Sequence, residues 1–171
     1  MPGAGKSEVA DAFHNAGFPV IVMGNVIREE TKSRGLDPNP KNTKTVMLDL
    51  RKRDGLGAIA IRCLDELKQQ SSDIVVIEGC RSVAEIDVFD DFAQDVTIIG
   101  VHSSPKIRFE RLRNRGRDDA PNEWTVFRER DMRELSVGLG DVIALSDIML
   151  INESTINHLK TESQKIVEGF L

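Results

Sequence analysis

The opening of the chain has residue types and spacing that suit phosphate binding. Residues 1–7 read MPGAGKS. In phosphate-binding loops, glycines let backbone N–H groups close on phosphate oxygens, a lysine reaches the β- and γ-phosphates, and a hydroxyl ligates magnesium. The segment therefore predicts an ATP site with Mg²⁺ held by the serine, built from Gly3, Ala4, Gly5, Lys6 and Ser7. The alternative is a chance glycine turn that caps the next helix.

The loop pattern would begin one residue before Met1, and the strand that normally feeds such a loop is absent from the sequence. In a P-loop fold that strand is central, so its loss would leave backbone groups of two neighbouring strands without ladder partners. We therefore expect the natural protein to start about 6–10 residues upstream, the length of one strand.

Helical and strand patterns alternate along the rest of the chain. Short apolar runs rich in β-branched residues predict buried strands at 19–23, 74–77, 96–101 and 148–151. Helical spacing predicts helices at 8–16, 24–33, 43–53, 56–69, 106–115 and 123–135, and a last helix that buries Ile156, Leu159, Ile166 and Val167. Strands alternating with helices indicate an α/β fold with a parallel sheet, and we expect a single domain over 1–171.

Composition narrows the classes of function. The 171 residues are 40% hydrophobic and carry a net charge of -5, which argues against bulk nucleic-acid binding. No apolar run reaches the roughly 20 residues of a membrane helix, and no charged-then-apolar leader opens the sequence, so we expect a cytoplasmic protein. Cys63 and Cys80 lack metal-ligand spacing and are expected to be reduced.

One stretch opposes the acidic character of the chain. Between residues 106 and 117 one acid, Glu110, stands among six basic residues, namely Lys106, Arg108, Arg111, Arg113, Arg115 and Arg117. Arg111 and Arg115 are four apart and share a helix face with Arg108, so their guanidinium groups could converge on triphosphate oxygens. The alternative is a solvated face whose charges pair with Asp118, Asp119, Glu129 and Asp131.

Six blocks along the chain resemble one archaeal P-loop kinase family. They read MPGAGKSEVAD, VIVMGNVIREE, LRKRDGLGAIA, VVIEGCRS, RLRNRGRDD and FRERDMREL. That family resembles dephospho-CoA kinases and adenylate-kinase-type nucleotide kinases. The resemblance implies a P-loop NTPase three-layer fold with a parallel sheet of about five strands, of which this chain lacks the central first one. It also implies an acceptor-binding arm at about 24–69 and an arginine-bearing lid at about 106–135.

The resemblance assigns roles to several polar residues. Arg111 and Arg115 match lid positions, where a closing lid excludes water from the transferring phosphate. Arg28 resembles the arginine that contacts the acceptor's phosphate, and Arg51 and Arg81 are candidates to complete that pocket. Asn152, after the last strand, would lie near the adenine, unless it is only a turn residue.

A carboxylate at a strand end can orient magnesium waters or accept a proton from the acceptor hydroxyl. The kinases that this chain resembles usually have an aspartate after the second strand, where this sequence has Asn25, which cannot act as a base. Asn25 is instead expected to cap the following helix. Glu78, at the end of the strand at 74–77, is the remaining acid at the expected edge, and we expect it to have a magnesium or base role.

Together these residues predict ATP-dependent phosphoryl transfer to a nucleotide-like or dephospho-CoA-like acceptor. Lys6 would neutralise phosphate charge, as phosphoryl transfer relies on positioning and electrostatics. Two alternatives remain open: a kinase of a non-nucleotide metabolite, and a regulatory module that binds ATP without transferring phosphate. We expect no membrane partner.

Overall fold

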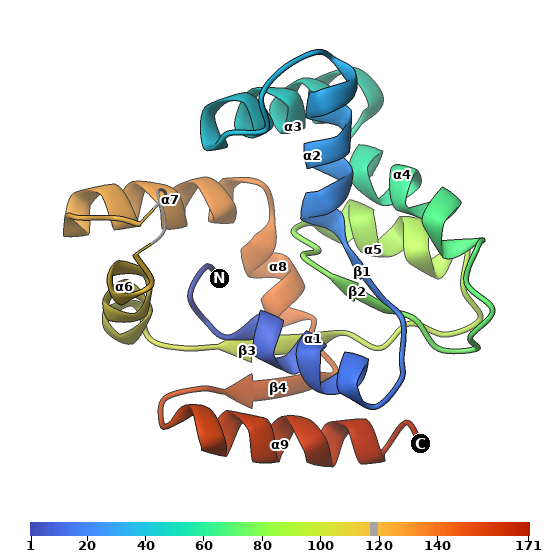
Figure 1. Ribbon diagram of the computed structural model, residues 1–171, viewed down its shortest axis with the longest axis vertical. Coiled ribbons are helices and arrows are strands. Elements are labelled where there is room, and N and C mark those ends of the chain that lie inside the picture. Colours follow the sequence, from blue (N-terminus) through green and yellow to red (C-terminus); the bar gives the residue numbers. More distant parts are fainter. Residues whose placement is uncertain (117–119) are drawn as a thin grey trace. The chain divides into compact units, whose positions relative to one another are not determined.

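The computed structural model describes residues 1–116 and 120–171 (Figure 1). Its contacts divide the chain into two compact units, one formed by residues 1–18 with 97–171 and the other by residues 19–96. The expected acceptor-binding arm lies within the second unit, and the described part of the expected lid lies within the first. Arg117, Asp118 and Asp119, from the expected basic cluster and its acidic partners, lie outside the described residues.

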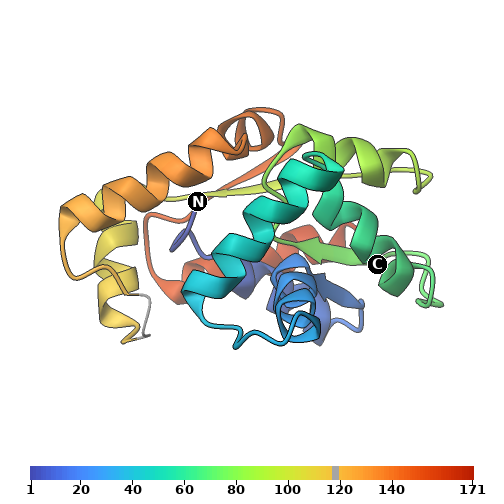
Figure 2. The same cartoon turned by 90° about the horizontal axis from the view of Figure 1, so that it is seen from above.

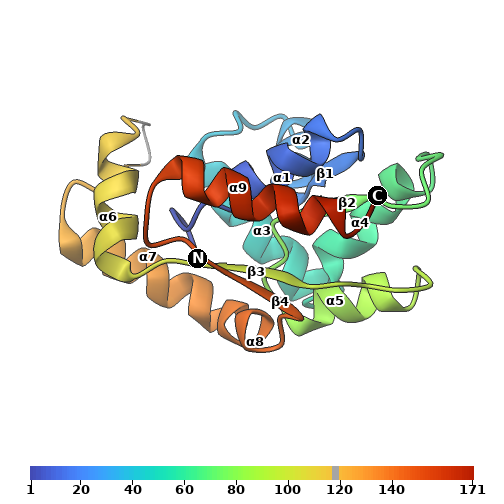
Figure 3. The same cartoon turned by 90° about the horizontal axis from the view of Figure 1, so that it is seen from below.

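The first unit is built around two parallel strands. Its elements are α1 (Lys6–Asn15), β3 (Ile99–His102), α6 (Pro105–Asn114), α7 (Trp124–Ser136), α8 (Leu139–Ala144), β4 (Ile148–Ile151) and α9 (Ile156–Glu168). The strands pair in register from Ile99 opposite Ile148 to His102 opposite Ile151. Helix α9 lies along α1 and β4, as Figures 1 and 3 show. This arrangement brings the start of α1 and the end of β4 into one neighbourhood.

The last helix buries part of the expected face. Leu159 and Val167 are buried, as expected, but Ile156 is exposed. Ile156 is the first residue of α9, where the helix has only just left the loop after β4. The expectation that it faces inward is therefore wrong.

Helices α6 and α7 cross each other within the first unit, as Figures 1 and 2 show, and aromatic side chains join them. The Phe109 ring meets the rings of Trp124 and Phe127 with centroids 5.4 and 5.6 Å apart. Trp124 therefore packs against aromatic rings of α6 and α7.

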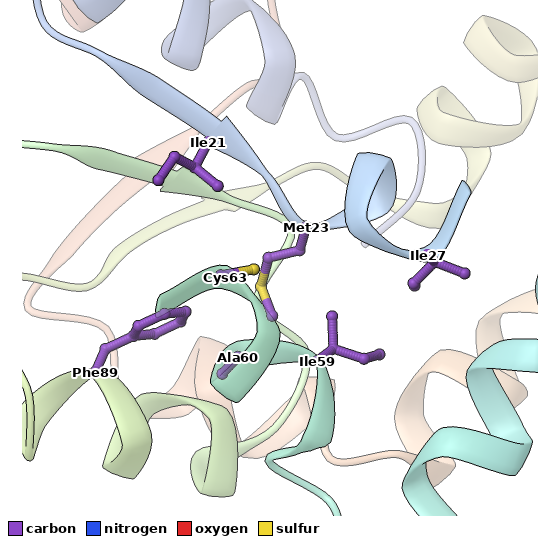
Figure 4. Packing of buried hydrophobic residues seen from close by; sticks show 7 residues of the cluster. All are labelled: Ile21, Met23, Ile27, Ile59, Ala60, Cys63 and Phe89. Atoms are coloured by element: carbon purple, nitrogen blue, oxygen red, sulfur yellow. The ribbon is translucent and has the colours of Figure 1, made fainter. Parts of the chain in front are cut away.

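The second unit pairs two short strands and covers them with helices. Its elements are β1 (Val20–Val22), α2 (Met23–Ser33), α3 (Pro40–Asp54), α4 (Ala58–Leu67), β2 (Val76–Glu78) and α5 (Val83–Asp90). Its strands are parallel, with Val22 opposite Glu78. The core, drawn in Figure 4, comprises Ile21, Met23, Ile27, Ile59, Ala60, Cys63 and Phe89.

Local signals set the ends of α3. The Asn39 side chain accepts a hydrogen bond from the Asn42 N–H, and Pro40 occupies the first turn, so the helix begins before the expected residue 43. Gly55, with φ of 90°, ends α3 at the expected break.

The four expected strands are present, although two begin two or three residues later than expected and extend one residue further. Among the described residues they form two separate two-stranded sheets, not one sheet of about five strands. Helices α5 and α8 were not expected. No helix in the described ranges is long and apolar enough to cross a membrane.

Candidate nucleotide site

The loop before α1 adopts a conformation that only glycine tolerates easily. Gly3 and Gly5 have φ of 78° and 108°, in the left-handed region. A Cβ on Gly3 would lie 3.0 Å from the Arg108 carbonyl oxygen, and one on Gly5 would lie 2.5 Å from the Asn152 amide nitrogen. The two glycines are therefore required by backbone conformation and by close packing.

Two side chains hold carbonyl oxygens of this loop. Arg108 Nη1 donates to the Pro2 oxygen at 3.2 Å, and Asn152 Nδ2 donates to the Ala4 oxygen at 2.8 Å. A carbonyl oxygen held by a protein donor is not directed at a phosphate. The loop can then present N–H groups to an anion, together with the positive end of the α1 dipole.

A cavity of about 390 Å³ opens beside the loop, within the size range of small-molecule sites. The loop and the start of α1 contribute Gly3, Gly5, Lys6, Ser7 and Glu8 to its lining. Helix α6 contributes Asn114 and Arg111, with Arg115 directly after it, and the segment after β4 contributes Asn152, Ser154 and Ile156. The loop and the two lid arginines of the sequence prediction therefore line one cavity.

Arg111 carries a charge that no acid of the described chain balances by a direct contact. Its Nη1 donates to Ser103 Oγ at 3.1 Å and to the Asn152 carbonyl at 3.2 Å. Its Nη2 donates to Asn152 Oδ1 at 3.2 Å and to the Ser154 carbonyl at 3.4 Å. All four acceptors are neutral, so the guanidinium is fixed in direction while its charge remains available to an anion.

Arg115 and Lys6 add exposed positive charge to the same cavity. Among the lining residues that the structure describes, three side chains are cationic and one, Glu8, is a carboxylate. Excess positive charge beside a helix start suits a polyanion such as a triphosphate.

Arg108 does not join this group, contrary to the expected stripe of converging guanidinium groups. It is buried, and its Nη1 and Nη2 donate to the two carboxylate oxygens of Asp131 at 2.8 and 2.6 Å. Its guanidinium carbon also lies 5.0 Å from the Phe127 ring centre. A neutralised, stacked arginine of this kind joins α6 to α7 and supports the loop through Pro2. The expected pairing with Asp131 is thus found for this arginine.

The second unit gathers polar groups at the carboxyl end of its strand pair. Glu78 ends β2 opposite Val22, and α2 starts at the next residue after β1. The Arg28 guanidinium folds back to the first turn of α2, where Nη2 donates to Asn25 Oδ1. Asn25 thus contacts Arg28 and does not form the expected helix cap, because the N-cap position falls on Val22.

Arg51 and Arg81 differ in their surroundings. Arg51 is buried, and its Nη2 lies 2.7 Å from Oε1 of the fully buried Glu85. Its Nε and Nη1 are buried without a hydrogen-bond partner. Arg81 is half-buried, its Nη1 lies 3.5 Å from the Met47 sulfur, and its backbone N–H donates to Glu85 Oε2 at 2.7 Å.

Sequence reasoning missed Glu85 and the helix that carries it. A usable signal was present, because Ser82 and Glu85 have the Ser-x-x-Glu spacing of a capping box that opens a helix. In the structure Ser82 is indeed the N-cap residue of α5, while the Glu85 carboxylate reaches back to the N–H of Arg81.

Both cysteines are unpaired thiols. Burial raises the pKa of Cys63 to about 12, with smaller contributions from Glu66 and Glu85. Burial also raises the pKa of Cys80 to about 12, and Glu85 adds to the shift. Both thiols are therefore protonated at neutral pH.

The lining of the cavity contains one side chain that fits the expected Mg²⁺, the hydroxyl of Ser7. The described residues contain no group of three or more His, Cys, Asp or Glu side chains arranged to hold a metal ion. A P-loop magnesium does not need such a group, because a hydroxyl, phosphate oxygens and waters supply its ligands. Ser7 lines the cavity and fits this donor set.

Comparison with known proteins extends over the whole chain. Residues 1–128 match the AAA domain family. A UPF0200 protein of Pyrococcus horikoshii is 45% identical over 175 residues, which cover 100% of this chain and 94% of the relative. For a UPF0200 protein of Hyperthermus butylicus the identity is 41% over 167 residues, covering 98% and 89% of the two chains. For one of Methanocaldococcus jannaschii it is 40% over 173 residues, covering 100% and 87%.

Proposed function

The chain belongs to the UPF0200 family and contains a nucleotide-binding P-loop domain of the AAA type, and from this premise we propose that it is an ATP-dependent phosphotransferase. The observation that carries the proposal is the cavity in which the phosphate loop, Lys6, Arg111 and Arg115 meet. An arginine fixed by four neutral acceptors is a preorganised positive charge, and such charges stabilise a transferring phosphoryl group.

The first unit supplies the nucleotide-binding residues of this proposal. Gly3, Ala4 and Gly5 shape the loop that receives the phosphates, and Lys6 neutralises the β- and γ-phosphates. Ser7 would hold Mg²⁺, which when bound neutralises phosphate charge and orients the terminal phosphate. Arg111 and Arg115 bind phosphate oxygens, and Ser154 and Ile156 border the rest of the nucleotide.

The second unit supplies candidates for the acceptor. We propose that Arg28 binds an acidic group of the acceptor and that Glu78 orients magnesium waters or takes the proton of the acceptor hydroxyl. Arg81 and Arg51 are the further acceptor-binding candidates. The ion pair with Glu85 gives Arg51 a second role, which is to tie α3 to α5. A nucleoside monophosphate or dephospho-CoA would suit such a set of cations.

Acceptor-dependent ATP consumption tests the proposal. A coupled assay on the full chain should show turnover with one member of a panel of nucleoside monophosphates, dephospho-CoA and small phosphorylated metabolites. Replacing Lys6 with alanine should lower kcat/KM about 100-fold or more, because a charge contact to the transferring group is lost. Lys160, an exposed lysine of α9, provides the matched control.

Neighbouring arginines give a sharper comparison. Arg115 lines the cavity, whereas Arg113 lies 5.8 Å from the Phe109 ring and does not line it. Arg115→Ala should therefore reduce turnover at least tenfold, and Arg113→Ala should leave it nearly unchanged. Equal effects of the two substitutions would contradict the assignment.

A second function is supported by Asn25, which stands where related kinases have an acid. A module that binds ATP without transferring phosphate needs no base at this position. ATP binding that persists with every acceptor of the panel, without turnover, would favour the module over the kinase.

A further inference from the structure

Asn152 connects the phosphate loop to the arginine of α6. It follows β4, and its own N–H donates to the His102 carbonyl at 2.7 Å, which continues the strand ladder by one residue. Its side chain is buried and hydrogen bonded at both ends. Nδ2 donates to the Ala4 carbonyl, 148 residues away in sequence, and Oδ1 accepts from Arg111 Nη2.

The partners of the carboxamide fix its orientation. The reverse orientation would set its oxygen against the Ala4 carbonyl oxygen and its NH₂ group against the Arg111 guanidinium. Both contacts would then be repulsive. An amide is therefore the side chain that fits between an acceptor on the loop and a cation on α6.

Packing leaves the loop and the carboxamide little freedom. The Gly5 Cα faces Asn152 so closely that an added Cβ would lie 2.5 Å from Nδ2. Both Asn152 and Gly5 line the cavity. The carboxamide thus lies against the phosphate loop, with its Nδ2 bonded to the Ala4 carbonyl and its Oδ1 bonded to Arg111.

We propose that Asn152 is a positioning residue of the nucleotide site that acts on the phosphates through its two partners. Its Nδ2 keeps the Ala4 carbonyl oxygen turned away from the bound phosphates, and its Oδ1 and main-chain oxygen aim the Arg111 guanidinium into the cavity. This replaces the expectation that Asn152 lies at the adenine. The inference rests on the proposed nucleotide site.

Substitutions at Asn152 separate the two ends of the carboxamide. Asn152→Asp keeps an acceptor for Arg111 but loses the donor to Ala4 and adds a negative charge beside the phosphates. Asn152→Ala loses both contacts. Asn15→Asp is the matched control, because Asn15 is exposed at the far end of α1, about 13 Å along the helix from its start.

Two probes distinguish phosphate positioning from base contact. Affinities for Mg-ATP and for Mg-tripolyphosphate, which has no base, are measured by titration calorimetry on the full chain. Asn152→Asp should weaken both by about 10- to 100-fold, and Asn152→Ala both by about 10-fold, since each loses hydrogen bonds that support charged contacts. Asn15→Asp should change neither by more than about twofold, because its charge lies beyond the Debye length.

The Arg111→Ala background tests the coupling between Asn152 and Arg111. If the carboxamide acts partly through Arg111, Asn152→Ala should cost less than about 4-fold in this background. Circular dichroism establishes that each variant is folded at the assay temperature, so a loss of fold is not read as a loss of affinity.

Each outcome decides the question. Equal losses for the two probes support phosphate positioning. A loss for ATP alone would overturn it in favour of a base contact, and unchanged affinity for both in a folded variant would overturn it in favour of a purely structural amide. Wild-type protein that binds neither probe would refute the proposed function itself, and the inference would fall with it.

Discussion

The buried ion pair of the second unit gives a stability prediction whose size can be worked from the structure. Arg51→Met leaves the Glu85 carboxylate fully buried without its cationic partner, although the Arg81 N–H still donates to it. Breaking a buried pair on one side costs about 3–5 kcal/mol.

A second effect works in the opposite direction. Arg51 Nε and Nη1 are buried without partners, and each such donor costs about 1–3 kcal/mol, so removing the guanidinium relieves part of the loss. We therefore expect Arg51→Met to lower the free energy of unfolding by about 2–4 kcal/mol at pH 7. The double variant Arg51→Met with Glu85→Leu should recover most of the lost free energy of unfolding, because an apolar pair replaces two buried charges.

Urea unfolding followed by circular dichroism at 222 nm measures these changes. Lys32→Met, which breaks an exposed ion pair with Glu29, is the control and should have little effect. A single variant as stable as the wild type, or a double variant no better than the single one, would refute this reasoning.

Three further predictions concern other parts of the chain. Gly5→Ala should lower Mg-ATP affinity at least tenfold in titration calorimetry, since φ of 108° disfavours a side chain and the added Cβ clashes; unchanged affinity would contradict the loop geometry. Asp131→Asn should lower the free energy of unfolding by about 2–4 kcal/mol in urea titrations, because it leaves the buried Arg108 without its carboxylate; a loss below 1 kcal/mol would mean the pair is not buried in solution. Cys63 and Cys80 should react with a thiol reagent at pH 8 far more slowly in the folded than in the urea-unfolded protein, since burial raises the pKa of each to about 12; equal rates would contradict their burial.

Local chemistry was sufficient for the phosphate loop, for the four strands and for most of the helices. In a loop that reads Gly-x-Gly-Lys-Ser before a helix, the glycines can adopt backbone conformations that other residues avoid. In the structure both Gly3 and Gly5 have φ in the left-handed region. The helix break at Gly55 and the strand at 148–151 follow from equally local signals. Helix α5 could have been predicted as well from its Ser-x-x-Glu start.

The roles of the arginines required the tertiary structure. Arg108, Arg111 and Arg115 share one chemistry, and helical spacing places them on similar faces. Their roles differ because their partners are distant in sequence. Asp131, 23 residues after Arg108, neutralises it, whereas Asn152, 41 residues after Arg111, holds that arginine without neutralising it. The sequence by itself determined that this chain has a phosphate loop and a cationic helix. Only the packing of distant segments decided which arginine has no carboxylate partner beside that loop. The reason is that helical periodicity sets the direction of a side chain but not the partner that it contacts.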